Sequence, residues 1–295
     1  DAVLGVGNYE EIVQTVKDAL ATDKKISKYG SIDNPIEETG RLVSTGPAWA
    51  YIKIADGCDN RCAYCIIPYL RGRFRSRPME NIIEEAKALA ESGVKELIVV
   101  AQDITRYGID LYKKLSLADL LKELCKIDGI QWIRLHYLYP DEFTDELIDV
   151  IANEDKIVKY LDIPIQHINN VILKRMNRRG TGDEIRELFA EIRRRIPGVV
   201  LRTSLISGLP GEGEAEFEEL CEFLREAKIE RAGVFPYSPE EGTPAERMER
   251  PDTETANERA EMIMEIQAGI MDQFNQSRMG TEETVLCEGF DEEYQ

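Results

Sequence analysis

Three cysteines in one short stretch are the residues of this sequence best suited to chemistry. Cys58, Cys62 and Cys65 stand in a C-x3-C-x2-C spacing within the segment GCDNRCAYCIIPYLRG. A loop of this kind can wrap three thiolates around one compact metal centre. A closed tetrahedral zinc site or a closed four-iron cluster takes four protein ligands, and no fourth cysteine or histidine lies nearby in the sequence. The spacing therefore predicts a [4Fe-4S] cluster with one open iron that is free to bind a substrate or cofactor.

The other cysteines and the two histidines bear on which metal the loop takes. Cys125 and Cys221 lie on apolar faces of expected helices and are predicted to be core residues, whereas Cys287 is uninformative. The alternative to iron is a zinc knuckle completed by His136, His167 or a distant cysteine, which would leave a metal-stabilised binding barrel without catalysis. Both histidines fall where strands are expected to end, and a hydrogen-bonded structural role is the simpler interpretation there.

Composition limits the class of protein. Of the 295 residues, 43% are hydrophobic and 32% are charged, which is ordinary for a globular protein. No run approaches the roughly 18 apolar residues of a membrane span. The opening residues, Asp1-Ala2-Val3-Leu4, lack the basic region and cleavage site of a signal peptide. Cysteines grouped in a motif indicate metal binding in a reducing compartment. We therefore predict a cytoplasmic enzyme with no membrane association.

The net charge of −19 comes from 37 basic and 56 acidic residues. Such a balance repels a phosphate backbone and attracts basic partners. It disfavours nucleic acid as a direct substrate and favours a protein or a small molecule, although acidic surfaces also serve solubility alone.

A run of four arginines stands out against this acidic background. Arg71, Arg73, Arg75 and Arg77 alternate, so in an extended segment they share one face. They predict either an anion site for a carboxylate or phosphate, or ion pairs with the many glutamates. The sequence favours neither interpretation.

From Ala48 onward, short apolar runs alternate with amphipathic ones. Runs rich in β-branched residues predict strands over 49–55, 95–101, 131–138, 159–165, 199–206 and 231–237. The runs between them predict helices over 79–92, 116–127, 144–153, 170–177, 183–195 and 214–227. Six β/α units of this kind predict an α/β fold with a parallel sheet, a partial (β/α)6 TIM-like barrel. In such barrels the chemistry lies where strands end, and the cysteine loop falls there.

The remaining segments predict the domain organisation. Residues 1–45 contain an apolar helical stripe over Tyr9–Ala21, followed by a polar linker. That helix is too short to bury its stripe alone, so we expect it to pack on something else, as the tail of a missing N-terminal domain. Residues 46–248 form the barrel, and 249–279 form a helical extension. Residues 280–295 resemble the first strand of a truncated β module.

The cysteine loop resembles that of the radical S-adenosylmethionine (SAM) enzymes. Their signature is C-x3-C-x-aromatic-C, and Tyr64 is the aromatic residue here. The resemblance implies that Cys58, Cys62 and Cys65 are cluster ligands, that Tyr64 lies against the cofactor, and that the open iron chelates the amino and carboxylate groups of SAM. An electron from the cluster then cleaves SAM to methionine and a 5′-deoxyadenosyl radical. No catalytic side chain is implied beyond the cluster and SAM.

The same resemblance implies SAM contacts where four strands end. Gln102 and Asp103 are candidates for the SAM amino group, with a capping pair in a loop as the alternative. Gln166 is the candidate for the ribose, and Phe235 is expected to pack on the adenine. After the fifth strand, a close-approach turn into a helix N-terminus is expected to lie against the adenosine or the carboxylate, and it contains Ser207, Gly208, Pro210 and Gly211.

Longer motifs narrow the resemblance to the methylthiotransferase branch of the radical SAM enzymes. They are GCDNRCAYCIIPYLRGRFRSRP, VAQDITRYGIDLY, LHYLYPDE, LDIPIQHIN and YSPEEGTPA, and the resemblance extends over essentially the whole stretch from Ala48 to Met248. AQDITRYG and SPEEGT resemble the members that modify an aspartate of a small-subunit ribosomal protein. Members that modify adenosine in tRNA tend to have an Asn-Val-Asn stretch and SPRPGT there. The alternatives are a tRNA adenosine methylthiotransferase or another radical SAM reaction, such as dehydrogenation.

The resemblance implies a reaction in two parts. A hydrogen is taken from the β-carbon of the aspartate, sulfur is then inserted from a second [4Fe-4S] cluster, and a methyl group comes from another SAM. The implied partners are a basic ribosomal protein and an electron donor such as a flavodoxin or ferredoxin. Full members hold the second cluster in an N-terminal domain and bind substrate with a C-terminal TRAM module, and this chain has no second cysteine triad. We therefore expect the second cluster only in the full-length protein, and expect this chain to cleave SAM without completing sulfur insertion.

Overall fold

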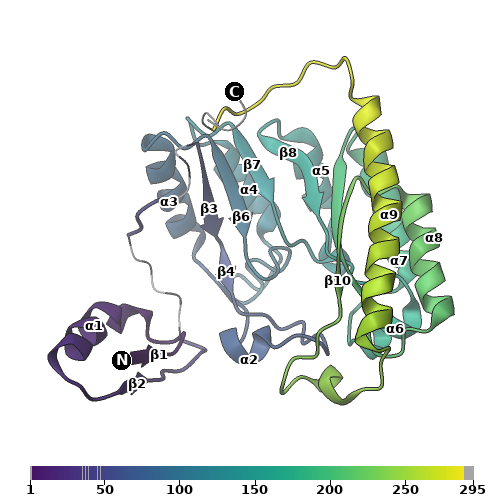
Figure 1. Ribbon diagram of the computed structural model, residues 1–295. Coiled ribbons are helices and arrows are strands. Elements are labelled where there is room, and N and C mark those ends of the chain that lie inside the picture. Colours follow the sequence, from purple (N-terminus) through teal and green to yellow (C-terminus); the bar gives the residue numbers. More distant parts are fainter. Residues whose placement is uncertain are drawn as a thin grey trace, which may run out of the picture.

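The computed structural model describes residues 2–34, 36, 38, 40–44, 46 and 48–288. Its centre is a six-stranded, all-parallel sheet in the order β10-β9-β8-β7-β6-β3 (Figure 1). The strands are β3 (Trp49–Lys53), β6 (Glu96–Val100), β7 (Trp132–Leu135), β8 (Ile157–Asp162), β9 (Val200–Ser207) and β10 (Arg231–Pro236). The two outermost strands, β3 and β10, are not paired with each other. The predicted partial (β/α)6 barrel, open along one side, is thereby confirmed.

Helices connect the strands as the sequence predicted. They are α3 (Met79–Glu91), α4 (Leu117–Cys125), α5 (Asp145–Asn153), α6 (Asn170–Arg175), α7 (Gly182–Arg195) and α8 (Glu214–Ala227). The burial of β9 shows how the sheet is layered, because Leu201, Thr203 and Leu205 are buried while Arg202 and Ser204 are partly exposed. One face of the sheet thus packs under the helices, and the other lines the open interior of the barrel.

The cysteine loop is closed at its base by a small antiparallel pair. This pair is β4 (Ala55–Asp56) with β5 (Arg75–Ser76), and the loop between them carries the short helix α2 (Ile67–Arg71). Gly57, directly after β4, has φ +76°, and a Cβ there would lie 2.0 Å from the carbonyl oxygen of Arg73. Only glycine fits this crossing, so the loop can begin and end at nearly the same point.

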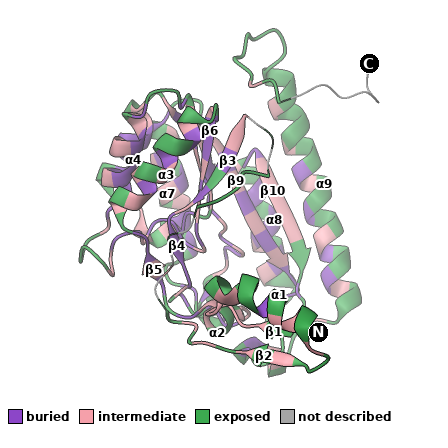
Figure 2. Ribbon diagram, turned by 90° about the vertical axis from the view of Figure 1, so that its left-hand side faces the viewer, coloured by how far each residue is buried: buried purple, intermediate pink, exposed green. Residues whose placement is uncertain are grey.

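The N-terminal segment forms a small unit of its own. It contains β1 (Ala2–Leu4), the 3-10 turn η1 (Tyr9–Glu11), α1 (Ile12–Ala21) and β2 (Ile26–Lys28), with β1 and β2 paired in parallel. The predicted helix is confirmed, but the segment interpreted as a linker contains β2. That interpretation was wrong because a three-residue strand is too short to show an alternating pattern. Figure 2 shows α1 largely exposed. Leu20 is 85% exposed, so the described part of the chain does not cover the apolar stripe, and its packing on a missing domain stays a prediction.

The C-terminal helix α9 (Thr253–Ser277) confirms the predicted helical extension and packs against β10 and α8. Two further 3-10 turns are η2 (Pro140–Glu142) and η3 (Pro244–Arg247). Residues 280–288 form no strand, contrary to expectation, and 289–295 lie outside the described residues. A single strand without a neighbour gains no ladder of hydrogen bonds to offset the ordering of its backbone. Among the described helices, none has the length and apolar character needed to cross a membrane.

Candidate functional site

The three cysteines lie in the loop that follows β3 and β4. Cys62 is buried, while Cys58 and Cys65 are partly exposed. The loop turns tightly, with the Cys65 N–H donating to the Cys62 carbonyl at 3.0 Å. Burial raises the pKa of the Cys58 thiol to about 11, and burial is also the main cause that raises the pKa of Cys65. Both groups therefore stay protonated at neutral pH until a metal displaces the proton.

A second, smaller apolar core holds this loop in place. It is separate from the main core under the helices and joins segments from five places in the chain: Ala63, Ile172, Met176, Leu209, Tyr237 and Ala245. Backbone bonds reinforce it, since the Ala63 N–H donates to the Met176 carbonyl at 2.8 Å and the Ala245 N–H donates to the Ala63 carbonyl at 2.9 Å. The cysteine loop, the turn after β9 and the segment after β10 are thus packed together at one end of the barrel.

Arg178, in the loop between α6 and α7, lies directly against the cysteines. Its Nη1 donates to the Cys62 Sγ at 3.7 Å and to the Tyr64 hydroxyl at 3.0 Å, and its Nη2 donates to the Pro164 carbonyl at 2.7 Å. The guanidinium stacks over the ring of Tyr139 at 4.6 Å, and the residue is only 8% exposed. One side chain therefore connects the cysteine loop to the end of β8.

The neighbouring loop of β6 is tied to the cysteines through Asp103. Its carboxylate accepts from the Asn60 amide at 2.9 Å and from the backbone N–H of Thr105 at 3.1 Å. Asp103 is buried, and burial raises the pKa of its carboxyl group. Gln102 differs, because its Oε1 is buried without a hydrogen-bond partner. Of the two residues, Gln102 has the unused polar atom and Asp103 fastens the cysteine loop.

The ends of β8 and β9 meet next to this loop. Gln166 has a left-handed backbone, with φ +69°, and bridges to Leu205. Such a conformation is costly for a residue with a side chain and is typical of functional sites. Other non-glycine residues in the loops at this end also have positive φ, among them Arg61, Tyr137 and Asn177. The Asn177 amide donates to the Arg61 carbonyl at 2.9 Å, so two of these strained positions support each other.

The turn after β9 is built around buried polar groups. The Ser207 hydroxyl donates to the Ala256 carbonyl of α9 at 2.8 Å, and the Gly208 N–H donates to the Glu212 carboxylate at 2.8 Å. Gly208 has φ +72°, and a Cβ there would lie 2.5 Å from the Cβ of Ala256. Pro210 is buried in the same turn. Phe235 is 57% exposed and lies beside Ile206 in the β9–β10 register.

The two histidines are engaged elsewhere. His167 is buried, its Nδ1 accepts from the Asn169 N–H at 3.0 Å, and its Nε2 faces the Glu212 carboxylate at 3.3 Å. The Nδ1 of His136 lies 3.7 Å from the Asp162 carboxylate. His167 therefore has the hydrogen-bonded surroundings that the sequence favoured, whereas the contact of His136 is longer than a hydrogen bond. Nowhere in the described part of the chain do three cysteine, histidine or acidic side chains converge on a position for a single metal ion.

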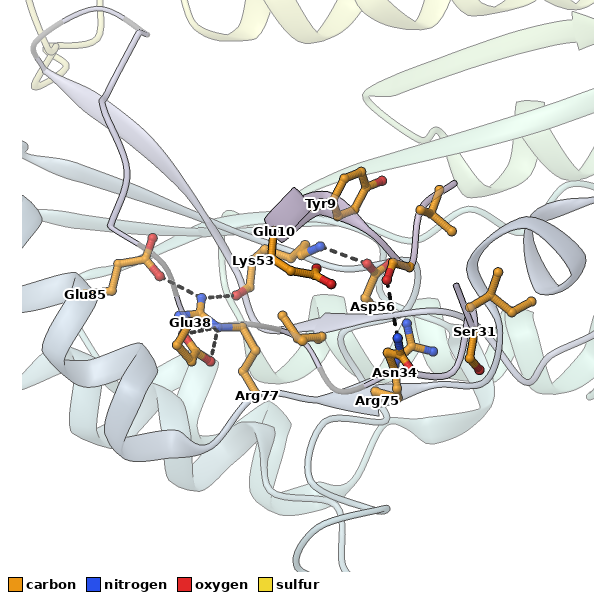
Figure 3. A pocket seen from close by; sticks show the side chains of 14 residues that line it. Tyr9, Glu10, Ser31, Asn34, Glu38, Lys53, Asp56, Arg75, Arg77 and Glu85 are labelled. Atoms are coloured by element: carbon orange, nitrogen blue, oxygen red, sulfur yellow. Dashed lines mark hydrogen bonds and ion pairs between the residues drawn. The ribbon is translucent and has the colours of Figure 1, made fainter. Parts of the chain in front are cut away.

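The arginine run lies at the base of the cysteine loop, and its members Arg75 and Arg77 line a cavity of about 500 Å³ together with residues of the N-terminal segment (Figure 3). Arg77 is buried and ion-paired with Glu38 and with Glu85, the latter at 2.7 Å. Arg75 lies 3.8 Å from Asp33, and Arg71 lies 3.9 Å from the Asp56 carboxylate. Of the two interpretations left open, these contacts support ion pairing for three of the four arginines.

Several residues of this site were missed in the sequence. Arg178, Asn60 and Glu212 carry no recognisable spacing, and only the fold brings them to the cysteines or to the turn after β9. Only their positions in the sequence could have pointed to two of them. Glu212 lies inside the turn motif SGLPGEG, and Arg178 lies in the polar stretch MNRRG, between two predicted helices.

The donor set fits a cluster with three protein ligands. Three cysteines share one rigid loop, and a buried cation lies against one of their sulfurs. A four-iron cluster binds each thiolate through a different iron, so the sulfurs need not converge on one point as they would for zinc. No histidine approaches them to complete a zinc site in the described contacts.

Comparison with known proteins supports this interpretation. The Radical SAM superfamily model matches residues 52–224. Coproporphyrinogen III oxidase (HemN) from Escherichia coli, a radical SAM enzyme, superposes with a TM-score of 0.56 at 18% identity, over 77% of this chain and 53% of that one. TsrM from Kitasatospora setae, a radical SAM methyltransferase, also superposes with a TM-score of 0.56 at 18% identity, over 67% of this chain and 38% of that one. These two structural similarities show that the chain shares the fold of these enzymes.

Curated relatives are much closer in sequence. One from Caldanaerobacter subterraneus subsp. tengcongensis, "Ribosomal protein uS12 methylthiotransferase RimO", is 52% identical over 99% of this chain and 67% of its own length. A protein of the same name from Pelobacter propionicus is 48% identical over 99% of this chain and 66% of its own length. The chain thus spans about two thirds of the length of these relatives. It belongs to the radical SAM superfamily and, within it, to the family of these methylthiotransferases.

Proposed function

We propose that this chain is the SAM-cleaving core of an enzyme that adds a methylthio group to the β-carbon of an aspartate in ribosomal protein uS12. The observation that carries the proposal is the three-cysteine loop, packed at the end of the barrel, in a chain 52% identical to a uS12 methylthiotransferase. The cluster and SAM, when bound, supply the one-electron cleavage that makes the hydrogen-abstracting 5′-deoxyadenosyl radical.

Cys58, Cys62 and Cys65 are assigned as the ligands of the cluster. In this proposal the side chains of the barrel end orient SAM and keep it from water. Gln102 takes the SAM amino group, because its Oε1 is the acceptor left without a partner. Asp103 acts indirectly, since its carboxylate already holds Asn60 and Thr105.

The remaining SAM contacts follow the strand ends. Gln166 bonds the ribose from its strained position after β8, and exposed Phe235 packs on the adenine. Ser207, Gly208 and Pro210 shape the turn that lies against the adenosine or the carboxylate. Ser207 does so through backbone alone, because its hydroxyl is bonded to α9. Tyr64 holds the cysteine loop to Arg178 beside the cofactor.

Uncoupled SAM cleavage tests the core activity. The chain is reconstituted with iron and sulfide without oxygen and reduced with dithionite, and 5′-deoxyadenosine is measured together with metal content. We expect about four irons per chain and deoxyadenosine formation. Zinc in place of iron, with SAM intact, would contradict the proposal and leave a metal-stabilised barrel.

Deuterium transfer tests the substrate. A peptide from the target loop of uS12, with deuterium on the aspartate β-carbon, is added to the reconstituted enzyme. The mass of the 5′-deoxyadenosine that forms is then measured by mass spectrometry. Breaking the C–D bond and forming the new bond at the 5′-carbon moves one deuterium into deoxyadenosine. A tRNA anticodon stem-loop with a deuterated adenosine is the comparison, and transfer of deuterium from that RNA but not from the peptide would favour the tRNA alternative. In this proposal the substrate is a basic protein and the electron comes from a flavodoxin or ferredoxin.

A further inference from the structure

The guanidinium of Arg178 is buried, and no carboxylate of the described residues is paired with it. Its contacts are the Cys62 sulfur, the Tyr64 hydroxyl, the Pro164 carbonyl and the ring of Tyr139. Within the described residues, no carboxylate oxygen lies within the 4.0 Å limit of an ion pair. Arginine does not lose its proton in proteins, so this charge remains.

A buried charge without a counter-charge is costly, because it has lost the water that would solvate it. The hydroxyl, carbonyl and ring supply partial charges only. Of the groups in contact with this guanidinium, the sulfur of Cys62, at 3.7 Å, is the one that becomes anionic when a cluster binds. The thiol of Cys65, a second cluster ligand, also lies within electrostatic reach of Arg178. Cys62 becomes a thiolate when it binds iron, because thiolates and not thiols are metal ligands.

We propose that Arg178 is a positioning residue whose cation compensates the negative charge of the cluster through Cys62 and raises the midpoint potential of the cluster. A four-iron cluster with three thiolates is anionic, and one added electron makes it more negative. A fixed cation in a dry site stabilises the reduced state more than the oxidised state. Hydrogen bonds to cluster sulfurs and net charge are established determinants of such potentials.

The loop 176–179, which carries Arg178, is attached to the cysteine loop by three further contacts. The backbone of Met176 accepts from Ala63, Asn177 bonds the Arg61 carbonyl, and Arg179 bonds Asn60 at 2.9 Å. Each contact attaches this loop to the cysteine loop next to the guanidinium. The cation is therefore kept at a fixed distance from the sulfur, as a tuning role requires.

The test is the midpoint potential of the reconstituted cluster, measured by a redox titration followed by electron paramagnetic resonance. Arg178→Met and Arg178→Gln remove the charge, and the glutamine variant keeps a donor for the Pro164 carbonyl in case the methionine variant does not fold. Arg178→Lys keeps the charge. Lys174→Met is the matched control, since it removes an exposed cation from the preceding helix α6. Circular dichroism establishes folding, and iron analysis establishes loading.

We expect the neutral variants to be harder to reduce by at least tenfold in the equilibrium constant, a shift of about 59 mV for one electron. Arg178→Lys and Lys174→Met should stay near the wild-type potential. A folded neutral variant that no longer retains four irons would support the proposal only if Arg178→Lys does retain them, because the loss would then follow the charge and not the side-chain contacts. Neutral variants with four irons and the wild-type potential would overturn it, as would a lysine variant shifted as far as the glutamine variant.

This inference rests on the cluster site alone and not on the identity of the substrate. Failure of deuterium transfer from the uS12 peptide would therefore leave it standing, and an unchanged potential in the neutral variants would leave the proposed function standing.

Discussion

Three arginines are buried in the part of the chain that the structure describes, and their surroundings differ. Arg77, at the base of the cysteine loop, is enclosed by the carboxylates of Glu38 and Glu85. Arg259 of α9 bonds the Glu212 carboxylate at 2.8 Å. Arg178, in the loop between α6 and α7, has a sulfur, a hydroxyl and a carbonyl as its neighbours.

The contrast separates two uses of a buried cation. Where the chain supplies its own carboxylates, as around Arg77, the charge is balanced within the protein and the pair belongs to the fold. Where the chain supplies no carboxylate, as around Arg178, the negative charge that balances the arginine has to come from what the site binds. The same residue type thus serves as a structural brace in one region and as part of a cofactor site in the other. The predictions below test this division, beginning with the largest effect.

Removing Cys62 should have the largest effect. Cys62→Ala takes away one of three ligands and the one sulfur in contact with Arg178. We expect the reconstituted protein to lose most of its iron and to form no 5′-deoxyadenosine above background, as iron analysis and chromatography would measure. Cys221→Ala is the control, because Cys221 is buried in the main core on α8. A Cys62→Ala protein that still cleaves SAM would contradict the site itself.

Arg77→Met should lower the free energy of unfolding of the metal-free protein by about 3 kcal/mol, because it leaves two carboxylates without their partner. We choose the low end of the usual range because Glu38 is only partly covered and can rehydrate. Urea unfolding measures the change.

A double variant sharpens the Arg77 test. Arg77→Met combined with Glu85→Gln should recover part of the loss, since one of the two uncompensated charges is then gone. A loss below about 1 kcal/mol for Arg77→Met would place the pair among ordinary surface ion pairs and would break the distinction from Arg178.

The fold could be predicted from the sequence because its signals are local. The alternation of apolar runs located all six strands and the helices between them, and the all-parallel order followed from it. The three-residue strand β2 and the missing strand after residue 280 show the limit of that method. β2 is too short for a period to be seen. The alternating pattern after residue 280 does not produce a strand, because strand formation depends on whether a partner is present.

The cysteines could be predicted because their spacing lies within one loop, whereas Arg178 could not. It is 116 residues away from Cys62 in the chain, and nothing in MNRRG marks which of its two arginines turns inward. Arg179, the next residue, is ion-paired with Asp141 at 2.9 Å and is 40% exposed at its side chain. Only the folded backbone, with Asn177 in its left-handed conformation, decides between the two arginines.

A third prediction concerns Arg259. Glu212→Gln keeps the shape of the side chain but removes the charge opposite Arg259 and places an amide where the Gly208 N–H and His167 converge. We expect a loss of about 2 kcal/mol in the free energy of unfolding and weaker binding of SAM at the adjoining turn.

The matched control for Glu212 is Glu214→Gln. Glu214 lies 3.5 Å from the same arginine but is 84% exposed at its side chain. It should change unfolding by less than about 0.5 kcal/mol. Equal effects of the two variants would show that burial of the carboxylate does not set its contribution to stability. Arg259 could then not be grouped with Arg77 as a cation that a buried carboxylate balances.

We expect the smallest effect on stability at His136, because an imidazole can lose its proton and its charge, whereas an arginine cannot. Burial is the main cause that lowers its pKa, and the neighbouring Asp162 opposes this only in part. With the folded pKa below the unfolded value of about 6.5, protons bind the unfolded chain more readily, so this contribution to stability is complete above that pH and is lost as the pH falls below it. We expect His136→Asn to flatten the loss of unfolding free energy between about pH 7 and pH 5, by less than about 1 kcal/mol because the ring is partly solvated. Urea unfolding at a series of pH values measures it, and identical slopes for the two proteins would show that Asp162 compensates the imidazolium as fully as Glu85 compensates Arg77.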